Sequence, residues 1–144
     1  MTILIDADGC PVVKIAVQLA TKYKKECIIL CDTSHTFSVE GARTITVSKG
    51  SDSVDFALVN MVQPGDIVVT QDYGLAAMCL ARKGIPISQN GMVYTDYNID
   101  SLLLARHTAK KVRMSGGRLK GPAKRSAEQD KAFEKKIEEL LVQN

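Results

Sequence analysis

The fold is decided by the stretch Ile3-Leu4-Ile5-Asp6-Ala7-Asp8, in which an apolar run ends in two carboxylates. A carboxylate at the end of a buried strand is costly to desolvate unless it reaches water, a cation or a hydrogen-bond donor. The same arrangement returns at Ile67-Val68-Val69-Thr70-Gln71-Asp72. Because sites in α/β proteins form at the carboxyl ends of strands, the two stretches predict a shared acidic site.

Strand and helix patterns alternate along the chain. Strands are expected over residues 2–6, 27–31, 43–47, 67–70 and 85–88, and helices from Pro11 to about Lys25, from Asp52 to before Pro64, from Leu75 to before Gly84, and over 99–112 and 127–142. Pro11 suits a first helical position, where its fixed φ and missing N–H cost nothing. Pro86 places the last strand near an edge, and Asn90-Gly91 predicts a turn into Met92-Val93-Tyr94. This alternation predicts an α/β fold with a mostly parallel central sheet and helices on both faces.

The composition is that of an ordinary globular chain. At 144 residues, with 45% hydrophobic and 24% charged residues, the chain is expected to form a single domain over residues 1–144. No apolar run approaches the ~20 residues that span a bilayer, and the N-terminus lacks the pattern of a secretory signal. No C-x-x-C pair occurs among the four cysteines, so reduced thiols, a cytoplasmic location and no membrane partner are expected.

Basic residues concentrate in one segment, residues 106–125, which contains eight Lys or Arg and no acid. Because the net charge of the whole chain is +3, the residues outside this segment have a net charge of about −5. This asymmetry is typical of a protein that holds a polyanion beside an acidic site, although a solvated helix end and loop would have the same composition. A flexible basic loop is expected at about 114–125, and the Ser48-Lys49-Gly50-Ser51 loop could hold a phosphate through its backbone N–H groups. The expected nucleic-acid contacts are Lys49, Arg113, Arg118, Lys120, Lys124 and Arg125.

Each acidic residue also has a capping explanation. Asp6 and Asp8 point to the same side of an extended chain, and a like-charged pair held close is costly without a cation. Asp52 and Asp55 share one face of a helix, and helix capping explains this pair better when it is taken alone. Asp72 also suits a cap. The recurrence of acids at strand-to-helix edges nevertheless favours an oxygen-rich site for Mg²⁺ or Mn²⁺, formed by Asp6, Asp8, Asp52, Asp55 and Asp72.

The same stretches resemble the bacterial YaiI/YqxD family. The resemblance is carried by Ile5-Asp6-Ala7-Asp8-Gly9-Cys10-Pro11, Asp52-Ser53-Val54-Asp55, residues 65–72, Asn90-Gly91 with Tyr94-Thr95, residues 116–122 and Asp130-Lys131-Ala132-Phe133. The family looks like a branch of the PIN-like superfamily, which implies a PIN-like three-layer α/β fold whose acids bind Mg²⁺ or Mn²⁺ and cut RNA or other nucleic acids. The resemblance implies that Asp6 is the first-strand acid and that Asp8 is an accessory ligand. It also implies that Asp52 or Asp55 is the middle-helix acid and that Asp72 is the acid of the V-T-x-D pattern.

The expected function is that of a divalent-metal-dependent nuclease for RNA or single-stranded nucleic acid, with Asp6 and Asp72 as catalytic residues. Two alternatives stay open. Asp6-Ala7-Asp8-Gly9 resembles the opening D-x-D-G of haloacid-dehalogenase-type phosphatases, in which the first Asp is the nucleophile, although Cys10 stands where that motif has Thr. A non-catalytic RNA-binding module would keep the fold without turnover. Asp96 is the nearest counterpart of a usual fourth acid and also suits a cap of the helix near Ile99.

Overall fold

The computed structural model describes residues 1–33, 38–50, 52–114, 116 and 124–143. The strands are β1 (Thr2–Asp6), β2 (Glu26–Asp32), β3 (Arg43–Val47), β4 (Ile67–Val69) and β5 (Ile85–Ile87). The helices are α1 (Val13–Lys22), α2 (Ser53–Met61), α3 (Tyr73–Ala81), α4 (Ile99–Met114) and α5 (Ala127–Val142). Strands and helices therefore alternate over most of the described chain, as the sequence predicts.

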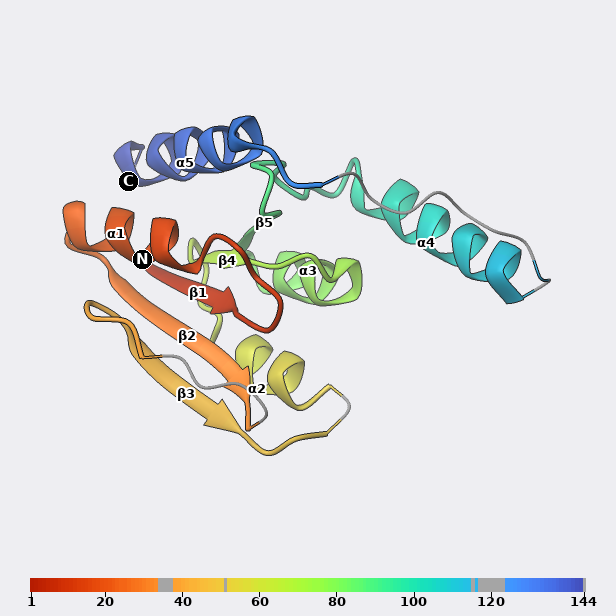
Figure 1. The fold of residues 1–144 in the computed structure, drawn as a ribbon, viewed down its shortest axis with the longest axis horizontal. Helices are drawn as coiled ribbons and strands as arrows, with labels where there is room; N and C mark the ends of the chain where they lie inside the picture. The colour runs from red at the N-terminus through yellow and green to blue at the C-terminus, as the bar shows by residue number, and fades with distance from the viewer. Residues whose placement is uncertain (34–37, 51, 115, 117–123, 144) are drawn as a thin grey trace.

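The five strands form one parallel sheet in the order β3-β2-β1-β4-β5. Ile3 and Ile5 of β1 face the side covered by α1 and α5, whereas Leu4 faces the side covered by α2 and α3. Figure 1 shows the sheet between these two helical layers. The expected α/β fold, with a parallel central sheet and helices on both faces, is confirmed as a three-layer arrangement. β5 lies at an edge, where Pro86 was expected.

The parallel register brings the carboxyl ends of the strands to one edge of the sheet. Ile5 near the end of β1 pairs with Val69 at the end of β4, and Val69 in turn pairs with Ile87 at the end of β5. The residues that follow β1 and β4 therefore emerge side by side, which is the condition that the acidic site requires.

The first helix is shorter than expected at both ends. Residues 7–10 form a turn in which the Cys10 N–H donates to the Ala7 carbonyl at 3.0 Å, and α1 begins only at Val13. The prediction that Pro11 is the first helical residue is therefore wrong, because this turn occupies the positions around it. At the other end, Lys24 adopts a left-handed φ of 57°, which ends the helix before Lys25.

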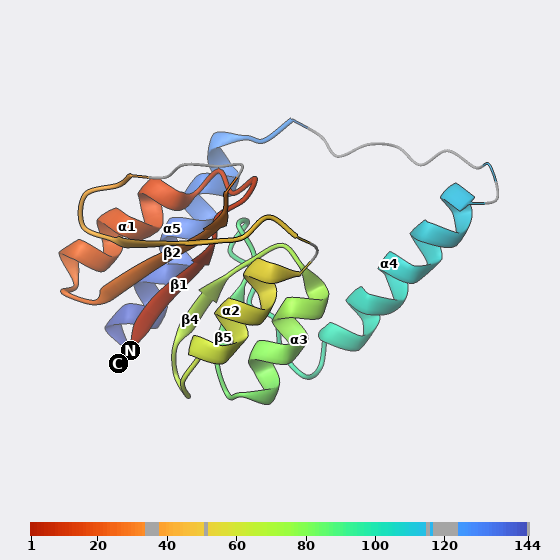
Figure 2. The ribbon, with the colours of Figure 1, turned by 90° about the horizontal axis from the view of Figure 1, so that it is seen from below.

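Helix α4 packs against α3 only through its first turns. Ile99 and Tyr94 are buried against Ala76 of α3, whereas Leu104 and Met114 are 64% and 77% exposed. Figures 1 and 2 both show the later turns of α4 extending away from the sheet and its helices. No helix in the part of the chain that the structure describes is long and apolar enough to cross a membrane.

The start of α4 is capped by a reciprocal pair of side chains. The Asn98 N–H donates to Thr95 Oγ1 at 3.2 Å, and the Thr95 N–H donates to Asn98 Oδ1 at 2.9 Å. Asp96 is exposed between them. The expectation that Asp96 caps this helix is wrong, because the side-chain hydrogen bonds at its start come from Thr95 and Asn98.

The turn after β5 packs directly on α5. Gly91 lies at φ +85°, and a Cβ added there would come within 2.6 Å of the Ala132 carbonyl oxygen. Ser88 Oγ accepts hydrogen bonds from the backbone N–H groups of Asn90 and Met92, and Ile87 forms an antiparallel bridge with Val93. The predicted turn at Asn90-Gly91 is therefore present, and it returns the chain as expected.

Gly91→Ala should lower the free energy of unfolding by about 3 kcal/mol or more, because it adds a backbone clash to the cost of a left-handed φ. Urea unfolding followed by circular dichroism measures the change. Gly65→Ala is the matched control, since Gly65 has a φ of +87° and open space around its Cβ position. Its loss should be only about 1–2 kcal/mol. Equal losses at the two positions would contradict the close packing of this turn on α5.

Candidate functional site

A threonine hydroxyl joins the two main acids at the carboxyl edge of the sheet. Thr70 directly follows β4 and is buried, and its Oγ1 donates to Asp6 Oδ2 at 2.8 Å. The same hydroxyl accepts a hydrogen bond from the Asp72 N–H at 3.0 Å. The buried Tyr94 hydroxyl donates to the Thr70 carbonyl at 3.1 Å, which fixes the backbone at this point. Asp6 and Asp72 are thus held in a defined relation by one side chain.

Two adjoining cavities, each of about 320 Å³, open at this edge. Asp6, Asp8 and Gln71 line both of them. Cys10 and Gln89 also line the first cavity, and Asp72, Tyr73 and Arg106 also line the second. Asp8 Oδ2 also accepts a hydrogen bond from the Asp32 N–H at the end of β2, at 3.2 Å. The structure therefore brings Asp6, Asp8 and Asp72 together, as the sequence predicts.

Asp55 in the first turn of α2 joins this group electrostatically. Burial, followed by the charges of Asp72, Asp6 and Asp52, raises the pKa of Asp55 from 3.8 to about 6. A side-chain hydrogen bond with Asp72 also favours the protonated form of Asp55. The pKa of Asp6 is raised as well, mainly by burial and then by Asp72 and Asp8, although its hydrogen bond from Thr70 lowers it. Such shifts are typical of acids that share one site without enough positive charge.

Asp52 lies at the rim of the group. It occupies the N-cap position of α2 with a left-handed φ of 65°, it is exposed, and its side chain makes no capping hydrogen bond. Helix capping therefore does not explain Asp52. It does explain part of the role of Asp72, whose Oδ1 accepts a hydrogen bond from the Leu75 N–H at 3.1 Å and caps α3.

Arg106 of α4 forms an ion pair with Asp72, with 3.5 Å between its Nη1 and Asp72 Oδ1. Its side chain is 60% exposed, so the pair contributes little to stability. The contact nevertheless places the basic helix α4 beside the acidic edge. Lys110 and Lys111 lie about one turn beyond Arg106 on the same helix. The Arg106 guanidinium would lie next to a phosphate group bound at the acids.

The acidic side chains are of the chemical type that binds a divalent cation, but their spacing is too wide for one. Carboxylate oxygens are the ligands that Mg²⁺ and Mn²⁺ prefer. The pKa values of Asp6 and Asp55 are raised first by burial and then by the negative charge of the neighbouring acids. Among the residues that the structure describes, however, no three His, Cys, Asp or Glu side chains are close enough to enclose an ion. Asp6, Asp8, Asp55 and Asp72, all of them partly buried, would therefore have to draw together around a cation.

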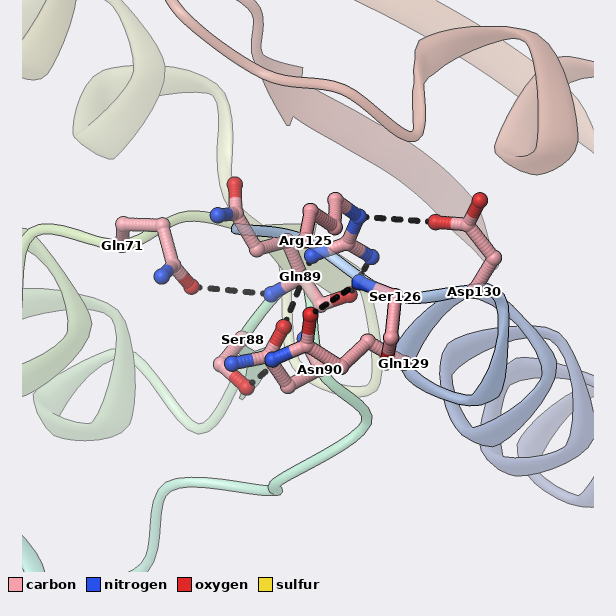
Figure 3. A network of polar contacts seen from close by, with 8 residues as sticks. All are labelled: Gln71, Ser88, Gln89, Asn90, Arg125, Ser126, Gln129 and Asp130. Carbon is pink, nitrogen blue, oxygen red and sulfur yellow. Dashed lines mark hydrogen bonds and ion pairs between the residues drawn. The ribbon is translucent and has the colours of Figure 1, made fainter. Parts of the chain in front are cut away.

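The expected nucleic-acid contacts are placed unevenly. Lys49 is exposed in the segment between β3 and α2, Arg113 lies in the last turn of α4, and Lys124 is exposed before α5. Arg118 and Lys120 lie outside the described residues. Arg125 contacts oxygens of the protein itself, as Figure 3 shows.

Three residues of this edge were missed from the sequence as site residues: Thr70, Gln71 and Arg106. Thr70 and Gln71 stand between an apolar strand and Asp72, so their position at a strand end was the available signal. Arg106 was visible only as one member of a basic run, because its approach to Asp72 depends on how α4 packs on α3.

Comparison with known proteins identifies relatives over nearly the whole length. The profile described as "Uncharacterized BCR, YaiI/YqxD family" matches residues 4–143. A "UPF0178 protein" of Exiguobacterium sibiricum is 54% identical over 143 residues, which cover 99% of this chain and 98% of that relative. A "UPF0178 protein" of Ruminiclostridium cellulolyticum is 52% identical over 137 residues, covering 95% of this chain and 90% of that relative. No solved structure matches the chain significantly.

The carboxyl group of Asp55 should titrate at about pH 6 in the metal-free protein, and Asp72→Asn should lower this pKa because it removes a neighbouring charge. Carboxyl ¹³C NMR measures both values. Asp96→Asn, on an exposed loop, is the control and should leave the titration of Asp55 unchanged. A pKa of Asp55 near 4 in both proteins would contradict the proximity of these acids.

The same shift predicts how stability depends on pH. Because folding raises the pKa of Asp55, the folded state binds the proton more tightly, and the free energy of unfolding should fall as the pH rises from about 4 to about 6. Above that range the loss is complete. Asp55→Asn should therefore stabilise the protein at pH 7.5, by about 1 kcal/mol because solvent screens this partly exposed side chain. Thermal unfolding at pH 4 and pH 7.5 measures the effect, which should be absent at the lower pH.

Proposed function

The chain belongs to the YaiI/YqxD family, and we propose that it is a divalent-metal-dependent nuclease that hydrolyses phosphodiester bonds in RNA or single-stranded nucleic acid. One observation carries the proposal: acids from three separate segments, those after β1 and β4 and at the start of α2, interact at one open edge of the sheet. Arg106 of a basic helix lies 3.5 Å from one of them. An acidic pocket beside a basic surface suits a polyanionic substrate whose reacting phosphate meets the acids through a cation.

The residues that would hold the cation are Asp6, Asp72 and Asp8, with Asp55 beside them. A divalent cation bound there would neutralise charge on the reacting phosphate and lower the pKa of an attacking water. Thr70 keeps Asp6 in place through its hydroxyl, which leaves the other oxygen of Asp6 for the site. Asp55, with a pKa of about 6, can hold a proton in the free protein and release it when positive charge arrives.

The basic surface would hold the strand on both sides of the cut. Arg106 can turn from Asp72 to a non-bridging phosphate oxygen, because a guanidinium binds phosphate as well as carboxylate. Lys110 and Lys111 continue along the exposed part of α4, and the basic segment 116–125 follows. Lys49, Arg113, Arg118, Lys120 and Lys124 remain proposed contacts of this surface.

The resemblance to PIN-like nucleases supports the same assignment. Asp6 and Asp72 correspond to the acids of the first strand and of the V-T-x-D pattern, and Asp55 suits the middle-helix acid better than Asp52 because Asp55 interacts with both. We also propose a cytoplasmic site of action, since Cys10, Cys27 and Cys79 form no disulfide in the structure and reduced thiols are usual in that compartment.

Asp6→Asn should reduce kcat/KM for Mn²⁺- or Mg²⁺-dependent cleavage of a labelled single-stranded RNA by at least about 100-fold, because it removes one ligand charge. The asparagine oxygen can still accept the Thr70 hydrogen bond, so the fold should remain intact by circular dichroism. Asp100→Asn, at an exposed position in the first turn of α4, is the control and should keep wild-type activity. Full metal-dependent cleavage by purified Asp6→Asn protein would overturn the proposal.

Two further measurements distinguish the nuclease from the two alternative functions. An aspartyl-phosphate trapped on Asp6 and located by mass spectrometry would favour a phosphatase of the haloacid-dehalogenase type. RNA binding that needs no divalent cation and survives Asp72→Asn, without any cleavage, would favour a non-catalytic RNA-binding module.

Arg106→Ala should raise KM several-fold and reduce the dependence of RNA affinity on salt by about 0.7 in the logarithmic slope, as expected for one lost phosphate contact. Fluorescence anisotropy at several salt concentrations measures this slope. Arg82→Ala is the matched control, because Arg82 is exposed and lies at the C-cap of α3, the opposite end of that helix from its N-cap Asp72. Identical slopes for Arg106→Ala and wild type would exclude Arg106 from the binding surface.

A further inference from the structure

Arg125 is built into the fold by three hydrogen bonds of 2.7 Å. Its Nε donates to Asp130 Oδ1 of α5, its Nη1 to Asn90 Oδ1, and its Nη2 to the Gln89 carbonyl. Figure 3 shows the guanidinium between the start of α5 and the turn after β5. The side chain is only 22% exposed. A guanidinium that donates to three acceptors in this way fixes the start of α5 relative to the turn after β5.

The turn that Arg125 contacts is held from other directions too. Ser88 Oγ accepts two of its N–H groups, and Gly91 lies against the backbone of Ala132. The helix on the other side starts with a capping box, in which the Ser126 N–H donates to Gln129 Oε1 at 2.9 Å. The backbone of Gln89 is therefore a rigid part of the molecule, although it lies outside any helix or strand.

This rigid backbone orients a side chain of the acidic edge. The Gln89 N–H donates to Gln71 Oε1 at 2.9 Å, as Figure 3 shows. Because a backbone N–H can only donate, the carbonyl oxygen of Gln71 must face Gln89, and its Nε2 is left as the donor end. Gln71 stands between Thr70 and Asp72 in the sequence and lines both cavities with Asp6 and Asp8.

We infer that Gln71 binds the substrate by donating from Nε2 to a phosphate oxygen of the nucleic-acid strand, and that Arg125 is the positioning residue that orients it through Gln89. The inference rests on the proposed nuclease function. Phosphate is repelled by Asp6 and Asp8, so a donor among them aids binding. A lysine or arginine at this place would pair with the carboxylates and compete with a cation, whereas a neutral amide donates without doing so. Arg125 thereby acts inside the protein and not as a direct contact of nucleic acid.

The test measures steady-state cleavage of a labelled single-stranded RNA with Mn²⁺, together with anisotropy of the same RNA in Ca²⁺. Gln71→Ala should raise KM and the RNA dissociation constant about tenfold and leave kcat within about twofold, as expected for a lost hydrogen bond to a charged group. Gln71→Glu should raise both further, because it adds a like charge. Gln63→Ala is the matched control, since Gln63 is exposed in the turn before β4, at the opposite edge of the sheet.

Arg125→Ala should raise KM about three- to fivefold, and Arg125→Lys should not restore it, because a single ammonium cannot reach three acceptors. The double variant Gln71→Ala/Arg125→Ala should have the same KM as Gln71→Ala alone, since the arginine acts through the glutamine. A merely structural arginine would instead lower kcat and add its effect to that of Gln71→Ala. Melting temperatures of all variants are measured first, and the assays are run below the lowest of them.

The outcomes separate this inference from the proposed function. If wild-type protein cleaves RNA but Gln71→Ala retains KM and RNA affinity within twofold, the inference is wrong and the nuclease stands. If the effects of the two substitutions on KM multiply, Arg125 does not position Gln71. If wild-type protein neither cleaves nor binds RNA with either cation, both proposals fall.

Discussion

The acidic edge depends on the hydrogen bonds of one hydroxyl group. Thr70 Oγ1 donates to Asp6 Oδ2 and accepts from the Asp72 N–H, so it connects the end of β1 to the start of α3 across the gap between two strands. Two like charges would otherwise separate at this point. The bond to the charged form of Asp6 lowers its pKa against the effects of burial and of the neighbouring acids. The Tyr94 hydroxyl then anchors the Thr70 backbone, which links the site to the packing of α4 on α3.

The charge balance of this edge is unfavourable to the folded state. Asp55 reaches a pKa of about 6 because it is partly buried beside Asp72, Asp6 and Asp52, and the ion pair with Arg106 is too exposed to offset the repulsion. A protein selected for stability alone would place uncharged residues here. The arrangement is instead typical of a functional site, where strain between like charges is relieved when a ligand binds.

Much of this structure could be predicted from the sequence. The apolar runs of β1 and β3 and the amphipathic pattern of α5 predicted bounds that the structure reproduces, because each pattern reflects one element packed on one core. The meeting of Asp6 with Asp72 followed from the shared edge of parallel strands. The first helix begins later than predicted because Pro11 suits a turn as well as a first helical position, and the turn signal of Asp8-Gly9 before it prevails.

The remaining features of the site depend on tertiary contacts that no local pattern encodes. Asp55 interacts with Asp72 only because α2 and α3 pack on the same face of the sheet. Arg125 was grouped with basic residues for nucleic acid, whereas its partners Gln89 and Asn90 lie 36 and 35 positions earlier in the chain. Its charge was visible in the sequence, and its use inside the protein was not.

Helix α4 has a mechanical consequence for the acidic edge. The helix is held to α3 by the buried Ile99, and Arg106 lies seven residues further on, about 10 Å along the helix axis. A tilt of α4 by about 10° at Ile99 would therefore displace the guanidinium by about 2 Å, which is enough to break its contact with Asp72. Because the outer turns of α4 extend away from the sheet and its helices, any force applied to them would move Arg106 and change the charge balance of the acidic edge.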